Sequence, residues 1–221
     1  MNKTSNQDQN RLYKSFVAAQ TRRNPCLQNL CEFLQNDNVS QHACRVICLD
    51  FSSISGPPSR RSLDLDGLAL LLYNTTKERD DLCGRLLIVE DLSSDVVETL
   101  GSSLNIDSLF FASHIDAFQN DIVTGRPSAI TLSSTTRSQN FLNLHYHRVI
   151  EFENLESKQV LLRDTNVPRK VKILPQVKGI NVGLARHCYS TLKIEGKDGL
   201  WLDKRGFINH RDIIIRRLIF E

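Results

Sequence analysis

One long stretch of alternating polarity, residues 141–154, sets the strongest limit on the fold of this chain. Its even positions from 142 to 152 are apolar apart from Arg148, whereas its odd positions include His145, His147 and Glu151. A period of two places successive side chains on opposite faces of an extended backbone. We therefore predict a long β-strand here, with the even positions buried and the odd positions facing water or serving a function.

Segments typical of helices and strands alternate over the rest of the chain. Apolar residues at helical spacing predict short helices at residues 11–21, 25–36, 63–74, 95–100 and 109–115. Short β-rich runs predict further strands at residues 44–51, 85–90, 129–132, 171–174 and 181–194. Residues 1–10 are polar and are expected to form a disordered tail. The economical fold for this order of elements is a layered α/β sandwich around a mixed β-sheet.

Two of the predicted helices carry local start signals. Asp95 with Glu98 three residues later is the pattern of a capping box, and Gly101 is a suitable helix end. Asp107 is placed to cap the next helix. His114, near the end of that helix, is expected to be a packing histidine rather than a general base.

Charge and composition exclude several classes of protein. The 28 basic and 25 acidic residues leave a net charge of +3 and alternate along the chain, so no nucleic-acid partner is expected. The longest apolar stretch is far shorter than the roughly 20 residues that span a bilayer. The start of the chain does not resemble a secretory signal, and the six cysteines include no CxxC pair. Reduced thiols in a cytoplasmic protein are the expectation.

Four segments in the same order carry a family resemblance. Residues 85–114, 140–148, 162–170 and 183–188 resemble the soluble domain of fungal CorA-like magnesium transporters. The resemblance implies an α/β domain that works within a homo-oligomer, and it alone suggests Mg²⁺ as a ligand. It divides the chain into a tail with short helices at 1–40, the CorA-like domain at 41–202 and a divergent segment at 203–221. The family's transmembrane helices have no counterpart, so no transport by this chain is expected.

Three groups of residues are candidates for a site. His145 and His147, with Glu151 on the same strand face, suit metal binding or acid–base catalysis, or form a polar outer face. The basic residues Arg148, Arg163, Arg169 and Lys170 suit an anion, or internal ion pairs that hold a loop. Asp64 and Asp66 suit a cation, although acidic residues are also favoured at a helix start.

Three functions remain open at this point. The first is a binding, regulatory or accessory module that does not transport ions. It would act by self-association or on another protein, and a small molecule is a further possible ligand. The second is an enzyme of fungal secondary metabolism, such as a cyclase, isomerase or hydrolase, built on the same scaffold. The third is a fragment of a longer magnesium transporter.

Overall fold

A computed structural model describes residues 5–36, 43–52, 56–73, 82–116, 140–152, 159–162, 165–167, 169–176, 178–195 and 210–216. Its helices are α1 (Ser5–Thr21), a 3-10 turn η1 (Pro25–Leu27), α2 (Gln28–Gln35), α3 (Leu65–Tyr73), α4 (Ser94–Leu104) and α5 (Ser108–Asp116). Its strands are β1 (Arg45–Ser52), β2 (Ser59–Leu63), β3 (Leu82–Glu90), β4 (Phe141–Phe152), β5 (Gln159–Leu162), β6 (Arg169–Ile173), β7 (Asn181–Glu195) and β8 (His210–Arg216).

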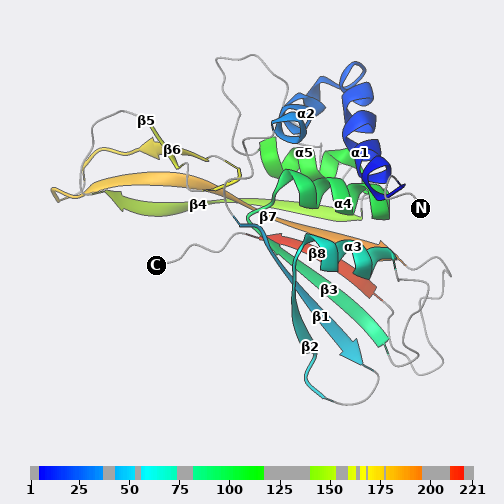
Figure 1. The fold of residues 1–221 in the computed structure, drawn as a ribbon. Coiled ribbons are helices and arrows are strands. Elements are labelled where there is room, and N and C mark those ends of the chain that lie inside the picture. The colour runs from blue at the N-terminus through cyan, green and yellow to red at the C-terminus, as the bar shows by residue number, and fades with distance from the viewer. Residues whose placement is uncertain are drawn as a thin grey trace.

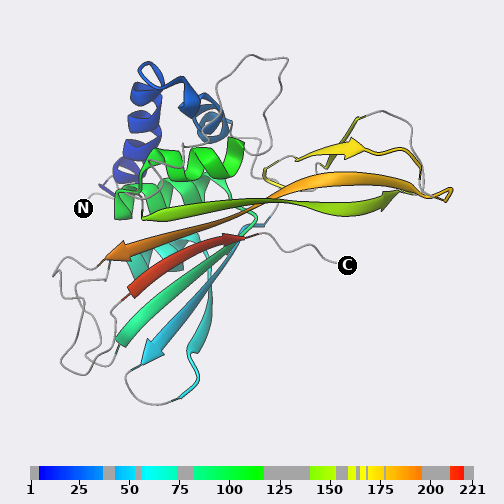
Figure 2. The same cartoon turned by 180° about the vertical axis from the view of Figure 1, so that it is seen from behind.

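The strands form one mixed sheet in which β7 belongs to two parts. The order is β2-β1-β3-β8-β7-β6-β5, and β4 pairs with β7. Strands β3 and β8 are parallel, whereas the other pairs are antiparallel. The predicted mixed α/β class is therefore confirmed. Figures 1 and 2 show the described helices on one face of the sheet, and β4 to β7 projecting beyond them.

The projecting part, which we call the arm, begins at a branch point on β7. β8 pairs with Ser190 to Glu195, and β6 pairs with Gly183 to Ala185. β4 runs along β7 for its whole length, from Phe141 opposite Leu192 to Phe152 opposite Asn181. The body therefore contains β2-β1-β3-β8 and the helices. The arm contains β5, β6 and the halves of β4 and β7 that lie farther from β8 (Figure 1).

The core lies between the helices and the sheet of the body. Phe110, Phe111 and Leu100 are fully buried, and they belong to one apolar cluster that also includes Val46 and Val89 of the sheet. The cluster extends to α1 and α2, so the N-terminal helices share the core. Burial of these side chains is the main force that holds the helical layer against the strands.

Helix α1 crosses α4 at a glycine. A Cβ atom at Gly101 would lie 2.6 Å from three atoms of the Tyr13 ring, so only a residue without a side chain allows this close approach. The Tyr13 hydroxyl donates a hydrogen bond to the carbonyl oxygen of Ile106 at 3.1 Å. Gly101 therefore serves helix packing and does not end α4, which continues to Leu104.

Several element boundaries differ from those that the sequence predicts. Helix α1 begins at Ser5, within the segment expected to be a disordered tail, because extending a nucleated helix costs little. The N-cap of α4 is Ser93, whose side chain accepts a hydrogen bond from the Val96 amide, so the predicted Asp95 capping box is wrong. The predicted Asp107 cap is confirmed by a 2.9 Å bond from the Leu109 amide. The predicted strand at 129–132 lies outside the described residues.

Candidate functional site

The predicted long strand is present as β4, but its two faces are exchanged. Phe141, at an odd position, is buried, and its ring lies 5.6 Å from that of Phe110 on α5. The odd face is therefore the one that the helices cover. His145 is half-buried on this face, while His147 and Glu151 lie farther along the arm and are exposed.

The even face of β4 carries exposed apolar side chains, so its predicted burial is wrong. Leu142, Leu144 and Tyr146 are 45%, 50% and 47% exposed. We call these three residues the β4 patch. The Tyr146 ring stacks on His187 of β7 at 5.2 Å, and His187 is itself buried. The patch is exposed because α5 packs on the opposite face, through Phe110 and His114.

The basic candidates come from adjacent strands of the arm. Arg148 is exposed and lies opposite Ala185 of β7, and Ala185 in turn lies opposite Val171 of β6. Arg169 and Lys170 occupy the start of β6, next to Val171. Arg163 lies outside the described residues. The register therefore places Arg148 two strands away from the β6 pair, which leaves the predicted anion site untested.

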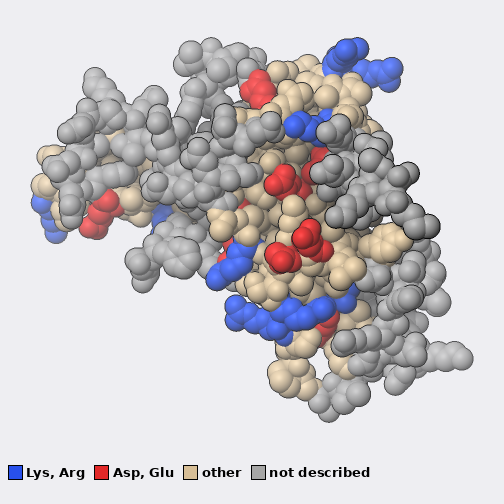
Figure 3. Space-filling model, in the orientation of Figure 1, with Lys and Arg blue, Asp and Glu red and all other residues tan. Residues whose placement is uncertain are grey.

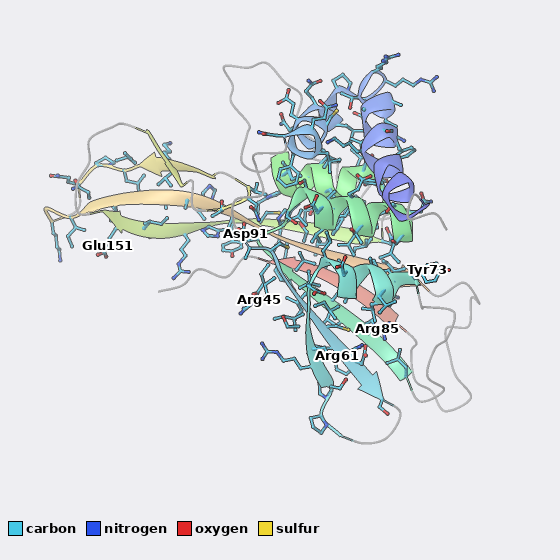
Figure 4. The ribbon with its side chains drawn as sticks, in the orientation of Figure 1. Arg45, Arg61, Tyr73, Arg85, Asp91 and Glu151 are labelled. Carbon is cyan, nitrogen blue, oxygen red and sulfur yellow. The ribbon has the colours of Figure 1, made fainter. Side chains whose placement is uncertain are left out.

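A polar clamp joins the body to the arm at the branch point. The Asp91 carboxylate, directly after β3, accepts hydrogen bonds from the Asn166 amide at 3.1 and 3.2 Å. The Asn166 side chain donates to the Asp91 carbonyl oxygen at 2.9 Å. Thr165, Asn166 and Val167 are all buried. Figure 4 shows Asp91 where the arm meets the body, so this clamp fixes the position of the segment that leads into β6.

Asp91 suits this position for a second reason. Its φ of 55° lies in the left-handed region, which aspartate and asparagine tolerate better than most residues with a side chain. Next to it, Arg45 donates to the buried Glu90 carboxylate across the β1–β3 pair. The clamp was only partly predictable, because the sequence marks Asn166 as a loop residue but gives no sign of a partner 75 positions away.

Replacing Asp91 with alanine should destabilise the protein by about 2–4 kcal/mol, since it leaves the buried Asn166 amide without its carboxylate acceptor and strains the backbone. The matched change, Asp91→Asn, keeps a side-chain oxygen and the tolerance for a positive φ, so it should cost clearly less. Urea denaturation of both variants measures this difference. Equal losses would show that the carboxylate–amide contact does not hold the arm.

A second charged cluster lies across β1, β2 and β3. Asp50 accepts hydrogen bonds from Arg61 Nη2 at 2.5 Å, Arg85 Nε at 2.6 Å and the Cys48 thiol at 3.3 Å. Figure 4 shows Arg61 and Arg85 at this end of the sheet, and Figure 3 shows basic side chains gathered in a band there. The arrangement is a carboxylate held between two guanidinium groups, which is a structural ion-pair network.

The ionisation of this cluster follows from its contacts. Burial alone would raise the pKa of Asp50, but the hydrogen bond and charge of Arg85, with help from Cys48 and Arg61, hold that pKa below its usual value. Burial and then the charge of Asp50 raise the pKa of the Cys48 thiol. Burial also raises the pKa of Cys44 to about 11. Thiols that stay protonated are poor nucleophiles, so neither cysteine suits covalent catalysis.

A buried polar group joins α5 to the β4–β7 pair. His114 Nδ1 and Ser190 Oγ are 2.8 Å apart, and Ser190 also donates to Asn143 Oδ1. The distance is that of a nucleophile and its base. However, Ser190 is fully buried and His114 is 6% exposed, so a substrate has no access to the hydroxyl. The group positions α5 on the sheet, in agreement with the packing role expected for His114.

The carboxylates proposed for a cation have local structural roles. Asp64 Oδ1 accepts a hydrogen bond from the Gly67 amide at 2.8 Å, and Asp66 lies exposed in the first turn of α3. Within the described residues, no group of three or more His, Cys, Asp or Glu side chains is placed to hold a metal ion. Among these same residues, no helix is long and apolar enough to cross a bilayer.

Comparison with known proteins adds no relative: no family model matches the chain, and neither does any curated protein or solved structure.

Proposed function

We propose that this chain is a binding, regulatory or accessory module of CorA-like origin that does not transport ions and that binds a protein partner through β4. The observation that carries the proposal is the β4 patch. Three large apolar side chains, Leu142, Leu144 and Tyr146, project about half-exposed from one face of one strand. Contiguous exposed apolar surface on a folded protein typically marks an interaction site.

The architecture of the arm supports a binding role. The described helices lie over the body, and the arm extends beyond them as a single layer of strands (Figure 2). A sheet normally buries at least one face against a second layer. On the arm, Val149 on the odd face is 59% exposed, and the β4 patch lies on the even face where β4 passes from the body to the arm. A partner protein would supply the missing layer.

The chemistry of the described residues favours binding over catalysis. In the described part of the chain, the close serine–histidine pair, His114 and Ser190, is enclosed in the core. The pKa values of Cys44 and Cys48 are raised, so both thiols stay protonated near neutral pH. An enzyme of secondary metabolism would need a nucleophile, acid or base that is accessible to a substrate and has a pKa suited to its task. The CorA-like origin rests on the resemblance of the four sequence segments.

A photo-reactive amino acid at position 144 should cross-link a protein partner in extracts of the source cells, whereas the same group at position 70 should not. Leu70 is the matched control, because it is 61% exposed on α3 and lies outside β4. Mass spectrometry of the cross-linked product identifies the partner, either a second copy of the chain or another protein. The purified partner should then bind wild-type protein and Leu70→Asp, but bind Leu144→Asp at least about tenfold more weakly, or ~1.4 kcal/mol.

The same variants separate binding from folding. Leu144 is half-exposed, so Leu144→Asp should change the free energy of unfolding by no more than about 0.5 kcal/mol. Equal cross-linking from positions 144 and 70, or a loss of stability typical of a core substitution, would contradict the proposed function.

A further inference from the structure

Among the described strands, β4 has one paired edge and one unpaired edge. It is 12 residues long, and its pairing partner is β7. An edge strand of this length presents a row of backbone N–H and C=O groups that can pair with another strand. We propose that β4 pairs antiparallel with β4 of a second copy of this chain, about a two-fold axis that passes through His147. This inference rests on the proposed function and names the partner.

The sequence of β4 is complementary to itself in this register. With the axis at His147, Leu144 lies opposite Ile150 of the second copy, so these two apolar side chains contact each other. Tyr146 lies opposite Arg148 of the second copy, where a guanidinium group can contact the aromatic ring. Because the axis is two-fold, each of these contacts forms twice.

The odd face fits the same register. Asn143 lies opposite Glu151 of the second copy, an amide opposite a carboxylate. His145 lies opposite Val149 of the second copy, which is 59% exposed in the single chain. Neither pair sets two like charges face to face, and cross-strand pairs of this kind stabilise a sheet.

Neighbouring registers are less favourable for identifiable reasons. An axis at Arg148 would set two guanidinium groups directly opposite each other. An axis at Tyr146 would place Leu144, an apolar side chain, opposite the charged Arg148 of the second copy. An axis at Val149 would leave Leu144 beyond the end of the paired β4 strand. The His147 register pairs almost the whole strand and gives every residue of the β4 patch a partner position.

The inferred dimer also fits the position of the arm. Antiparallel pairing about a two-fold axis is isologous, so the same surface of each copy is used and the assembly closes as a dimer. β4 would become an internal strand of a sheet that continues from one copy into the other. The contact would pair the free backbone edge of β4 and would place a cross-strand neighbour beside each residue of the β4 patch.

Cysteine cross-linking of the purified chain tests both the partner and the register. Directly opposite residues of an antiparallel pair have Cα atoms about 4.5–5.5 Å apart, which a disulfide can bridge. Mild oxidation of His147→Cys should therefore give a covalent dimer. His145→Cys and Val149→Cys lie on the same face but two residues from the axis, so their cysteines would be roughly 13 Å apart and should remain uncross-linked. Wild-type protein, with its native cysteines, gives the background.

Sedimentation equilibrium without oxidant gives the second reading. Wild-type protein should form a dimer that Leu144→Asp weakens at least tenfold and that Leu70→Asp leaves unchanged. Cross-linking at position 145 or 149 instead of 147 would overturn the register. A wild-type chain that stays monomeric at about 100 μM would have a dimer dissociation constant well above that concentration. This result would overturn self-pairing. In that case a different protein cross-linked at position 144 would still support the proposed binding function.

Discussion

Replacing Phe110 with alanine should lower the free energy of unfolding by about 3–5 kcal/mol. The Phe110 side chain is fully buried, and its ring lies 5.1 Å from that of Phe111 and 5.6 Å from that of Phe141. The substitution would leave a cavity between α5 and the start of β4, and close-packed neighbours can fill such a cavity only in part. Urea denaturation followed by circular dichroism measures the loss.

Phe16→Ala is the matched control for this prediction. Phe16 is 46% exposed on α1, so its loss should cost less than about 1 kcal/mol. Similar losses for the two variants would mean that Phe110 does not join the helical layer to β4. The comparison matters for function, because the contact between Phe110 and Phe141 determines which face of β4 is covered and which is exposed.

Replacing Asp50 with asparagine should cost about 2–4 kcal/mol at neutral pH, because it leaves two guanidinium groups without their carboxylate. The Arg85 side chain is only 14% exposed, whereas that of Arg61 is 46% exposed. Most of the loss should therefore come from Arg85, and Arg61→Ala should cost less than Asp50→Asn. The exposed Asp66 gives a control, since Asp66→Asn should change stability by less than about 0.5 kcal/mol.

The contribution of Asp50 should also depend on pH. Its pKa is lower in the folded protein than in the unfolded chain, where an aspartate has a pKa of about 3.9. The stability that it provides is therefore fully present above the unfolded pKa and is lost as pH falls through the folded pKa. The difference between wild-type protein and Asp50→Asn should be constant from pH 6 to about pH 5 and shrink below about pH 4. A difference that is independent of pH would rule out the carboxylate as its source.

Elements with strong local patterns could be predicted from the sequence, and elements set by distant contacts could not. The apolar run of β3 and the Asp107 cap of α5 were identified from neighbouring residues alone. β2 was missed because its sequence, Ser-Arg-Arg-Ser-Leu, lacks an apolar alternation and its side chains are largely exposed. Residues 203–221, set apart as a divergent segment, supply β8, which lies between β3 and β7.

The candidate site shows the same limit. The period of two in β4 was predictable, but periodicity cannot tell which face the helices will cover. Phe141 is the residue that decides this, through its contact with Phe110, a residue 31 positions earlier in the chain. The β4 patch was therefore assigned to the core, although its residues were correctly placed on one face. The Asp91–Asn166 clamp likewise joins residues too distant in sequence for local reasoning.

The position of β8 has a consequence for how the protein is made. Of the described strands it is the last to leave the ribosome, and yet it lies inside the sheet, where it joins β3 to β7. Until it is synthesised, the edge of β3 and the segment Ser190–Glu195 of β7 that β8 will join lack this partner, and the nascent chain carries two open stretches of sheet edge. β3 and β8 are also parallel and more than a hundred residues apart, an arrangement that forms slowly. The body of the protein can therefore close only after β8 has been synthesised, and the growing chain is most prone to aggregate just before that point.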